Sequence, residues 1–163
     1  MFLYKKRQTT STEQEHRMKK RNILAVLVFC TSLIVSGCAL VKPTDQTLAG
    51  TSWEVTGYHN GQSIASVIND AKTLTANFGT DGKMGGSAGC NSYSSPYTAE
   101  AATNSLVLGR IISTKMACSQ DGIMRQEQQF LAALRTVAIY HIGGDTLILQ
   151  TADGTVAIHL KKK

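Results

Sequence analysis

A serine in a glycine-rich stretch is the first residue whose type and setting could do chemistry. Residues 85–89 read Gly-Gly-Ser-Ala-Gly, which fits the G-x-S-x-G pattern with Ser87 as the nucleophile. That nucleophile needs a sharp turn from a strand into a helix. The next residues, Cys90 to Pro96, cannot start a helix promptly. We therefore expect glycines in a bent strand, and a small hydrolase using Ser87 is the less favoured alternative.

Two cysteines, Cys90 and Cys118, are the second candidates for chemistry. They do not form a C-x-x-C motif, which argues against thioredoxin-like redox work. They are either two buried free thiols or a disulfide, and a disulfide is favoured outside the cytoplasm. A thiol enzyme using Cys90 remains an alternative. The choice between these readings depends on the compartment, which the start of the chain addresses.

The start of the chain has the features of an export signal. Lys19, Lys20 and Arg21 precede an apolar run from Ile23 to Val35. As a helix this run would span about 20 Å, against about 30 Å of hydrocarbon in a bilayer. It is therefore too short for an ordinary transmembrane helix and is typical of a signal peptide. Met18 directly before it is an alternative start of the protein.

The residues after the apolar run, Val-Ser-Gly-Cys ending at Cys38, resemble the lipobox of bacterial lipoproteins. The resemblance implies cleavage before Cys38 and lipid chains on it, which would anchor the protein to a membrane. Ala39 follows, and the absence of an aspartate there favours the outer membrane, facing the periplasm. The alternative is an ordinary signal peptide with a chance cysteine. In this oxidising compartment we expect Cys90 and Cys118 to form a disulfide.

The positive charge of the chain lies mostly in this leader. The net charge is +6, from 17 basic and 11 acidic residues. Seven of the basic and two of the acidic residues lie in the first 21 positions, so the rest of the chain carries about +1. We therefore do not expect nucleic-acid binding.

The histidines and aspartates form no pattern that would bind a metal. His59, His141 and His159 are far apart in the sequence, and each lies in or beside an expected strand. The aspartates fall at expected turns or helix caps, where turn chemistry explains them better than catalysis. We expect no metal, no cofactor and no catalytic residue.

Alternating apolar residues predict antiparallel strands in residues 48–163. Asp81 with Gly82 and Asp153 with Gly154 predict hairpin turns between strands, and Gly143 to Asp145 a third turn. The residues expected on buried strand faces are Trp53, Val55, Leu74, Ala76, Phe78, Leu147, Leu149, Val156, Ile158 and Leu160.

One stretch, residues 122–137, follows a helical period instead. We expect its apolar face to cover the concave face of the sheet, with Phe130 and Leu134 in the core. Asp121 is the expected N-cap, and a pair of strands is expected to end the chain. The expected apolar face is Ile123, Met124, Phe130, Leu131, Leu134 and Val137, and the expected polar face is Gln126, Gln128, Gln129 and Arg135.

These pieces together resemble the META domain (HslJ-like) family of small envelope lipoproteins. The glycine–cysteine–asparagine at 89–91 and the threonine-to-cysteine segment at 114–118 are the most specific matches. The residues that carry the motif are Trp53, Gly89, Cys90, Asn91, Thr114, Met116, Cys118, Glu127 and Phe130.

The resemblance implies an α+β fold: a single small domain with an antiparallel curved sheet, or incomplete β-barrel, and one amphipathic helix packed on it. The expected organisation is a leader at 1–37, lipidated Cys38 with a tether at 38–47, and a META-like domain at 48–163. The family has no established catalytic residues and is associated with envelope stress.

The expected function is a non-catalytic envelope lipoprotein that binds an envelope protein, a peptide or a lipid. A variant of this expectation is an inhibitor of a periplasmic hydrolase, which would present an exposed loop such as residues 92–98.

Overall fold

The computed structural model describes residues 47–68 and 73–163. The expected leader, Cys38 and the tether up to residue 46 lie outside these ranges. Residues Pro43–Lys163 form one compact unit, which carries every element described below. Within the described ranges, no helix is long and apolar enough to cross a membrane.

Strands dominate this unit. The first group is β1 (Thr51–His59), β2 (Ile64–Ser66), β3 (Thr75–Phe78), β4 (Lys83–Ser87), β5 (Ser92–Glu100), β6 (Ser105–Leu108) and β7 (Ile112–Ser113). Helix α2 (Ile123–Arg135) follows, and β8 (Val137–Gly143), β9 (Thr146–Thr151) and β10 (Val156–Lys162) end the chain.

The strands form an antiparallel barrel of eight strands. Strand β1 pairs with β3 on one side and with β10 on the other, so the ladder of neighbours closes on itself. The order around the ring is β1, β3, β4, β5, β6, β8, β9 and β10, while β2 and β7 are short additions to β1 and β5. The shortest strand pairing in the ring is between β6 and β8, where Ser105 and Ile139 are the single registered pair. The expected curved antiparallel sheet with one helix is confirmed, and the pairing of β1 with β10 closes the barrel that was expected to be incomplete.

The expected hairpin turns are present. Asp81 and Gly82 join β3 to β4, and the Asp81 carboxylate accepts a hydrogen bond from the N–H of Lys83 (3.1 Å). Asp153 and Gly154 join β9 to β10 in the same way, with the N–H of Thr155 donating to Asp153 (3.0 Å). These short loops set the register of the strands on either side.

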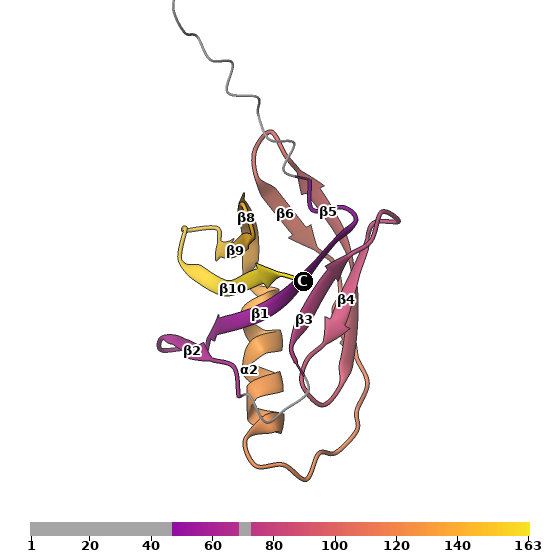
Figure 1. Cartoon of the computed structure of the whole chain (residues 1–163), viewed down its shortest axis with the longest axis vertical. Helices are drawn as coiled ribbons and strands as arrows, with labels where there is room; N and C mark the ends of the chain where they lie inside the picture. The colour runs from indigo at the N-terminus through magenta and orange to yellow at the C-terminus, as the bar shows by residue number, and fades with distance from the viewer. Residues whose placement is uncertain (1–46, 69–72) are drawn as a thin grey trace, which may run out of the picture. The chain divides into compact units, whose positions relative to one another are not determined.

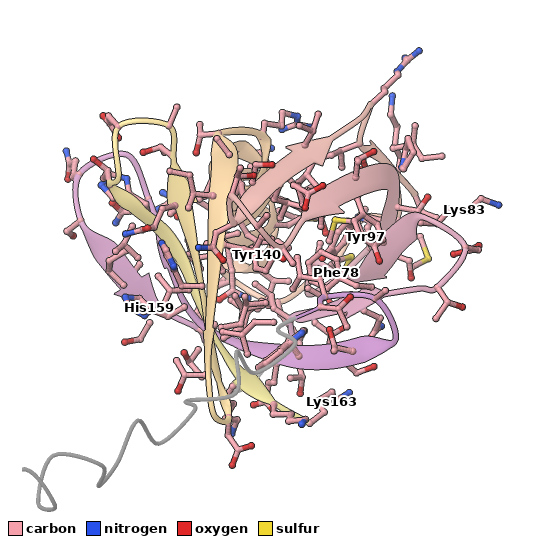
Figure 2. All side chains as sticks on the ribbon, turned by 90° about the horizontal axis from the view of Figure 1, so that it is seen from above. Phe78, Lys83, Tyr97, Tyr140, His159 and Lys163 are labelled. Atoms are coloured by element: carbon pink, nitrogen blue, oxygen red, sulfur yellow. A yellow bond between two sulfur atoms is a disulfide. The ribbon has the colours of Figure 1, made fainter. Side chains whose placement is uncertain are left out.

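Apolar side chains from all sides of the ring fill its interior. Helix α2 packs against β1 and β10, and Figure 1 shows it running behind these two strands. Phe78 and Tyr140 lie inside the ring when it is seen from above, whereas Lys83 points to solvent (Figure 2). The largest side chains with less than 2% exposure are Trp53, Phe78, Phe130, Tyr140, Leu48, Leu74, Met84, Leu106, Ile123, Leu134, Leu147 and Leu149.

The helix differs from its sequence prediction at both ends. It begins after Gly122, whose left-handed backbone (φ 80°) forms the N-cap without any side-chain cap bond, so the prediction of Asp121 as the cap was wrong. It ends at Arg135, and Val137 opens strand β8. The chain therefore ends in three strands rather than the expected pair.

The buried face of α2 also differs from the prediction. Its buried positions repeat at three- and four-residue spacing from Ile123 to Leu134, as a helix of 3.6 residues per turn requires. Gln126 falls on this face and is 1% exposed, whereas Met124 falls off it and is 36% exposed. Both had been assigned to the opposite side. The predicted core positions Phe130 and Leu134 are confirmed.

Candidate functional site

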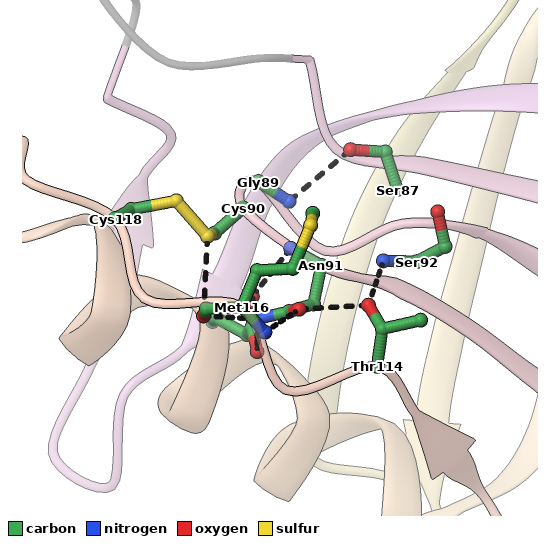
Figure 3. Close-up of a disulfide and its surroundings, with 9 residues drawn as sticks. Ser87, Gly89, Cys90, Asn91, Ser92, Thr114, Met116 and Cys118 are labelled. Atoms are coloured by element: carbon green, nitrogen blue, oxygen red, sulfur yellow. Dashed lines mark hydrogen bonds between the residues drawn. A yellow bond between two sulfur atoms is a disulfide. The ribbon is translucent and has the colours of Figure 1, made fainter.

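Cys90 of the glycine-rich stretch forms a disulfide with Cys118. Cys90 follows strand β4 and Cys118 lies in the segment that leads to α2, with their Cα atoms 6.1 Å apart. The bond ties the β4–β5 connection to that segment (Figure 3). A disulfide sulfur has no S–H, so the 3.6 Å approach of Cys90 Sγ to the carbonyl oxygen of Met116 is a packing contact. The predicted pairing is confirmed.

Asn91, directly after Cys90, connects three segments of the chain. Its Oδ1 accepts hydrogen bonds from the Thr114 hydroxyl and from the N–H of Met116, both at 2.7 Å. Its Nδ2 donates to the carbonyl oxygen of Met116 (3.2 Å) and to Oε1 of Glu127 (2.9 Å). Its side chain is thus saturated, and Asn91 is only 2% exposed.

Glu127 completes this arrangement from the first half of α2. Its Oε2 accepts a hydrogen bond from the backbone N–H of Asn91 (2.9 Å), and its Oε1 from the Asn91 side chain. Glu127 is 6% exposed, and such bonds to a buried carboxylate offset the cost of removing it from water. We call Cys90, Asn91, Thr114, Met116, Cys118 and Glu127 the motif cluster; Figure 3 shows most of it.

Thr114 and Met116 enter this cluster in different ways. The Thr114 hydroxyl accepts a hydrogen bond from the N–H of Ser92 (3.2 Å) while it donates to Asn91. Met116 contributes only its backbone, and its side chain is exposed. The side chain of Met116 therefore plays no part in holding the cluster together.

Two glycines next to the cluster are required by close approach and by backbone conformation. A Cβ on Gly86 would overlap the carbonyl group of Thr75, on the neighbouring strand β3. Gly89 has a φ of +108°, which residues with a side chain rarely adopt, and this lets the chain turn into Cys90.

The hydroxyl of Tyr93 lies next to these glycines and donates a hydrogen bond to the Thr75 carbonyl (2.8 Å). Burial raises the pKa of Tyr93.

Ser87 does not have the geometry of a nucleophile elbow. It is the last residue of β4, and the chain continues through a turn into strand β5 rather than into a helix. Its Oγ accepts a hydrogen bond from the N–H of Gly89 (3.2 Å), and Ser87 is 8% exposed. Gly85 and Gly86 lie in a strand as expected, and Gly89 lies in the turn that follows it.

Residues 92–98 do not form the exposed loop considered for an inhibitor. They belong to β5, which pairs with β4 along one side and with β6 and β7 along the other. Alternate residues Tyr93 and Ser95 are buried, as in a strand with one inward face. That expectation was wrong.

The two aromatic residues of the motif belong to the core. The Trp53 Nε1–H donates to the hydroxyl of Thr51 (2.7 Å), which satisfies its polar atom while the ring is 1% exposed. The Phe130 ring packs edge-on against Tyr58 of β1 and Tyr93 of β5, at centroid distances of 6.4 and 5.6 Å. Phe130 therefore links two different walls of the barrel.

Gln126 is buried, although it was predicted on the polar face of the helix. Its Oε1 accepts a hydrogen bond from the N–H of Ile68 (2.7 Å), which holds the segment after β2 against α2. Its Nε2 has no partner among the described residues. The signal was in the spacing, because Gln126 lies four residues before Phe130 and eight before Leu134, on the same helical face.

The described surface also contains a groove at the second half of α2. It has a volume of about 440 Å³ and lies between residues 128–136 at the end of α2 and its C-cap, the turn at 59–61 and the β9–β10 hairpin at 151–157. Its floor is made of small side chains, including Ala132, Ala133 and Ala157. None of its residues was predicted as a site, because alanines and glutamines on a helix give no sequence signal of a groove.

The three histidines of the described chain lie apart, on β1, β8 and β10. Within the described ranges, no three histidine, cysteine or acidic side chains gather where they could hold a metal ion.

Comparison with known proteins identifies the family. The model of the META domain family matches residues 46–163. An NMR structure of a protein from Burkholderia xenovorans is similar at 21% identity, with 71% of this chain and 83% of that chain covered and a TM-score of 0.58. A second NMR structure is similar at 19% identity, with 69% and 89% covered and a TM-score of 0.52. At such identities the likeness shows the fold alone, and the comparison with curated proteins returned no match.

The family match covers every strand, the helix, the disulfide and the motif cluster described above. The chain therefore belongs to the META domain family.

Proposed function

We propose that this META-domain protein is a non-catalytic, lipid-anchored binding module of a bacterial cell envelope, serving envelope maintenance under stress. Cys38 is the anchor, and the outer membrane facing the periplasm is its location. The apolar run from Ile23 to Val35 and the Val-Ser-Gly-Cys box ending at Cys38 support export and anchoring. The Cys90–Cys118 disulfide fits an oxidising compartment.

The non-catalytic role is supported by one observation: the side chains that could do chemistry are already bonded to other groups of the protein. Cys90 is held in the disulfide, and Ser87 Oγ is held by the N–H of Gly89. Asn91 and Glu127 direct their polar atoms at each other and at backbone groups. Side chains engaged in this way stabilise the fold, and the open groove beside α2 is left as the surface for a ligand.

The anchoring is tested by mass spectrometry of the mature N-terminus after expression of the full chain in a Gram-negative host. We expect a chain that begins at Cys38 and carries acyl chains. Cys38→Ser should abolish lipidation and release the protein from the membrane fraction. An unmodified Cys38, or a cut at another residue, would contradict the anchoring.

The non-catalytic role is tested with covalent probes on the native protein. A fluorophosphonate probe should leave Ser87 unlabelled, and iodoacetamide should leave Cys90 unlabelled unless the protein is first reduced. Labelling of Ser87 that disappears in the Ser87→Ala variant would favour a serine hydrolase instead.

A further inference from the structure

The groove beside α2 exists because two paired strands separate. The register between β1 and β10 ends at Tyr58 and Ile158. Beyond that point β1 turns away into β2, and the N–H of Asn60 donates to the carbonyl of Ser63 (3.0 Å) to close the turn. Strand β10 already begins at Val156, two residues before the last pair with β1. The slot between the separating strands therefore lies beside the start of β10, and Val156 and Ala157 are among its lining residues.

The Asn60 side chain stabilises the turn beside this slot. Its Oδ1 accepts hydrogen bonds from the N–H groups of Gln62 and Ser63, both at 3.0 Å. The side chain and the N–H of Asn60 are thus both bonded within its own turn, which begins where the pairing of β1 with β10 ends. The floor of the slot is shallow and apolar because Ala132, Ala133 and Ala157 have short side chains. A volume of about 440 Å³ lies within the range of pockets that bind small ligands.

The rim of the groove is polar, and Asp153 is the one acidic side chain among its lining residues. Gln128 and Gln129 offer amide groups that can both donate and accept hydrogen bonds. Nδ1 of His59 accepts a hydrogen bond from the N–H of Gly61 (3.1 Å). The carboxylate of Asp153 is already engaged by the Thr151 hydroxyl and the N–H of Thr155.

The composition of the lining discriminates between classes of ligand. It contains no lysine or arginine that would bind a phosphate or a carboxylate, and no tryptophan, tyrosine or phenylalanine on which a sugar ring would stack. A ligand with alternating N–H and C=O groups and small apolar side chains matches both the amide rim and the alanine floor. An extended peptide has this chemistry, and addition to strand backbone is a common mode of peptide recognition.

We propose that the groove between α2, the end of β1 and the start of β10 binds an extended, uncharged peptide segment with small apolar side chains. This inference deepens the proposed binding role and rests on it. It does not require the anchor: an unlipidated Cys38 would contradict the anchoring and leave the peptide site untouched. A failed titration would contradict the peptide site and leave the anchoring untouched.

The test is a titration of the isotope-labelled unit 43–163, followed by two-dimensional NMR. This unit can be tested alone because it contains the whole barrel, the helix and the disulfide. The probe is the capped peptide acetyl-Ala-Val-Ala-Val-amide. We expect saturable shifts of the amide signals of Gly61, Ala132 and Ala157, while Val107 on β6 stays unchanged.

Matched variants locate the site. Ala132 is exposed, so Ala132→Phe should fill the groove without disturbing the core and weaken the peptide at least roughly tenfold. Ala101→Phe, on the exposed turn between β5 and β6, should leave the affinity unchanged. Gln128→Ala, a second exposed position on the rim, should weaken binding as well, without adding bulk.

Two results would overturn the proposal. One is the absence of shifts at about 5 mM peptide, since that would place the affinity beyond the weakest useful range. The other is shifts at the groove from diacetylchitobiose or from monomeric dihexanoylphosphatidylcholine but not from the peptide, which would assign the groove to a glycan or a lipid.

Discussion

The two ends of helix α2 contact very different surroundings. At its first half, Gln126 and Glu127 are buried, and Glu127 bonds to Asn91 of the motif cluster. At its second half, Gln128 and Ala132 are exposed and line an open groove. The polar side chains of Asn91 and Glu127, which belong to the motif, thus bond to each other inside the protein. Gln128 and Ala132, which belong to no motif, face solvent. In this molecule the motif residues stabilise the fold, and the binding surface that we propose lies elsewhere.

The largest effect on stability is expected at Phe130, which lies between the two ends of the helix. Phe130 is fully buried between Tyr58, near the groove, and Tyr93, near the motif cluster. Phe130→Ala should lower the free energy of unfolding by about 3–5 kcal/mol, through lost transfer energy and a cavity. Urea unfolding measures this loss. Met124→Ala, on the exposed side of the same helix, is the control and should change it by less than about 0.5 kcal/mol.

A loss below about 0.5 kcal/mol for Phe130→Ala would mean that the two ends do not share a core. The comparison between a structural end and a binding end would then lose its physical basis.

Removal of the disulfide should affect the motif cluster and spare the groove. The bond closes a loop with a sequence separation of 28, for which the chain-entropy model gives roughly 3–4 kcal/mol. We expect the Cys90→Ala, Cys118→Ala double variant to melt at a lower temperature while it still binds the capped peptide. Non-reducing peptide mapping should find the Cys90–Cys118 pair. Two free thiols in protein purified from the envelope would refute the bridge.

The smallest effect is expected at Ser87. Its Oγ accepts one hydrogen bond from Gly89, so Ser87→Ala should cost about 0.5–1.5 kcal/mol and leave any envelope phenotype intact. Complementation of a deletion strain checks this. Lost function with an unchanged circular dichroism spectrum would show that the motif region does chemistry after all.

The spacing of apolar residues and the Asp-Gly turn sequences predicted much of the fold. The Asp-Gly turns, the alternation in β1, and the helical face around Phe130 and Leu134 were predictable because each is local. The alternation predicted for β10 holds only from Ile158 onward, because a register shift between Val156 and Ile158 buries Ala157 and leaves Val156 half-buried. The closure of the barrel was not readable, since the pairing of β1 with β10 joins residues about a hundred positions apart, such as Trp53 and Lys162.

The candidate sites were predictable only in part. The pairing of Cys90 with Cys118 followed from the number of cysteines and the expected compartment. The bonds from Asn91 to Glu127 did not, because nothing local indicates which side chain an asparagine will meet. Gln126 was placed in solvent because a polar residue was assumed to be exposed, although its spacing put it on the buried face. The groove lies where strands β1 and β10 diverge, and no residue pattern in the sequence predicts that divergence.

The coupling energy between Asn91 and Glu127 tests the central claim most directly. It is obtained from the unfolding free energies of Asn91→Ala, Glu127→Ala and the double variant. Because the two side chains saturate each other in a buried site, the double variant should be less destabilised than the two single variants added together, by about 1–3 kcal/mol. A coupling below about 0.5 kcal/mol would show that the motif residues do not hold each other and would contradict their structural role.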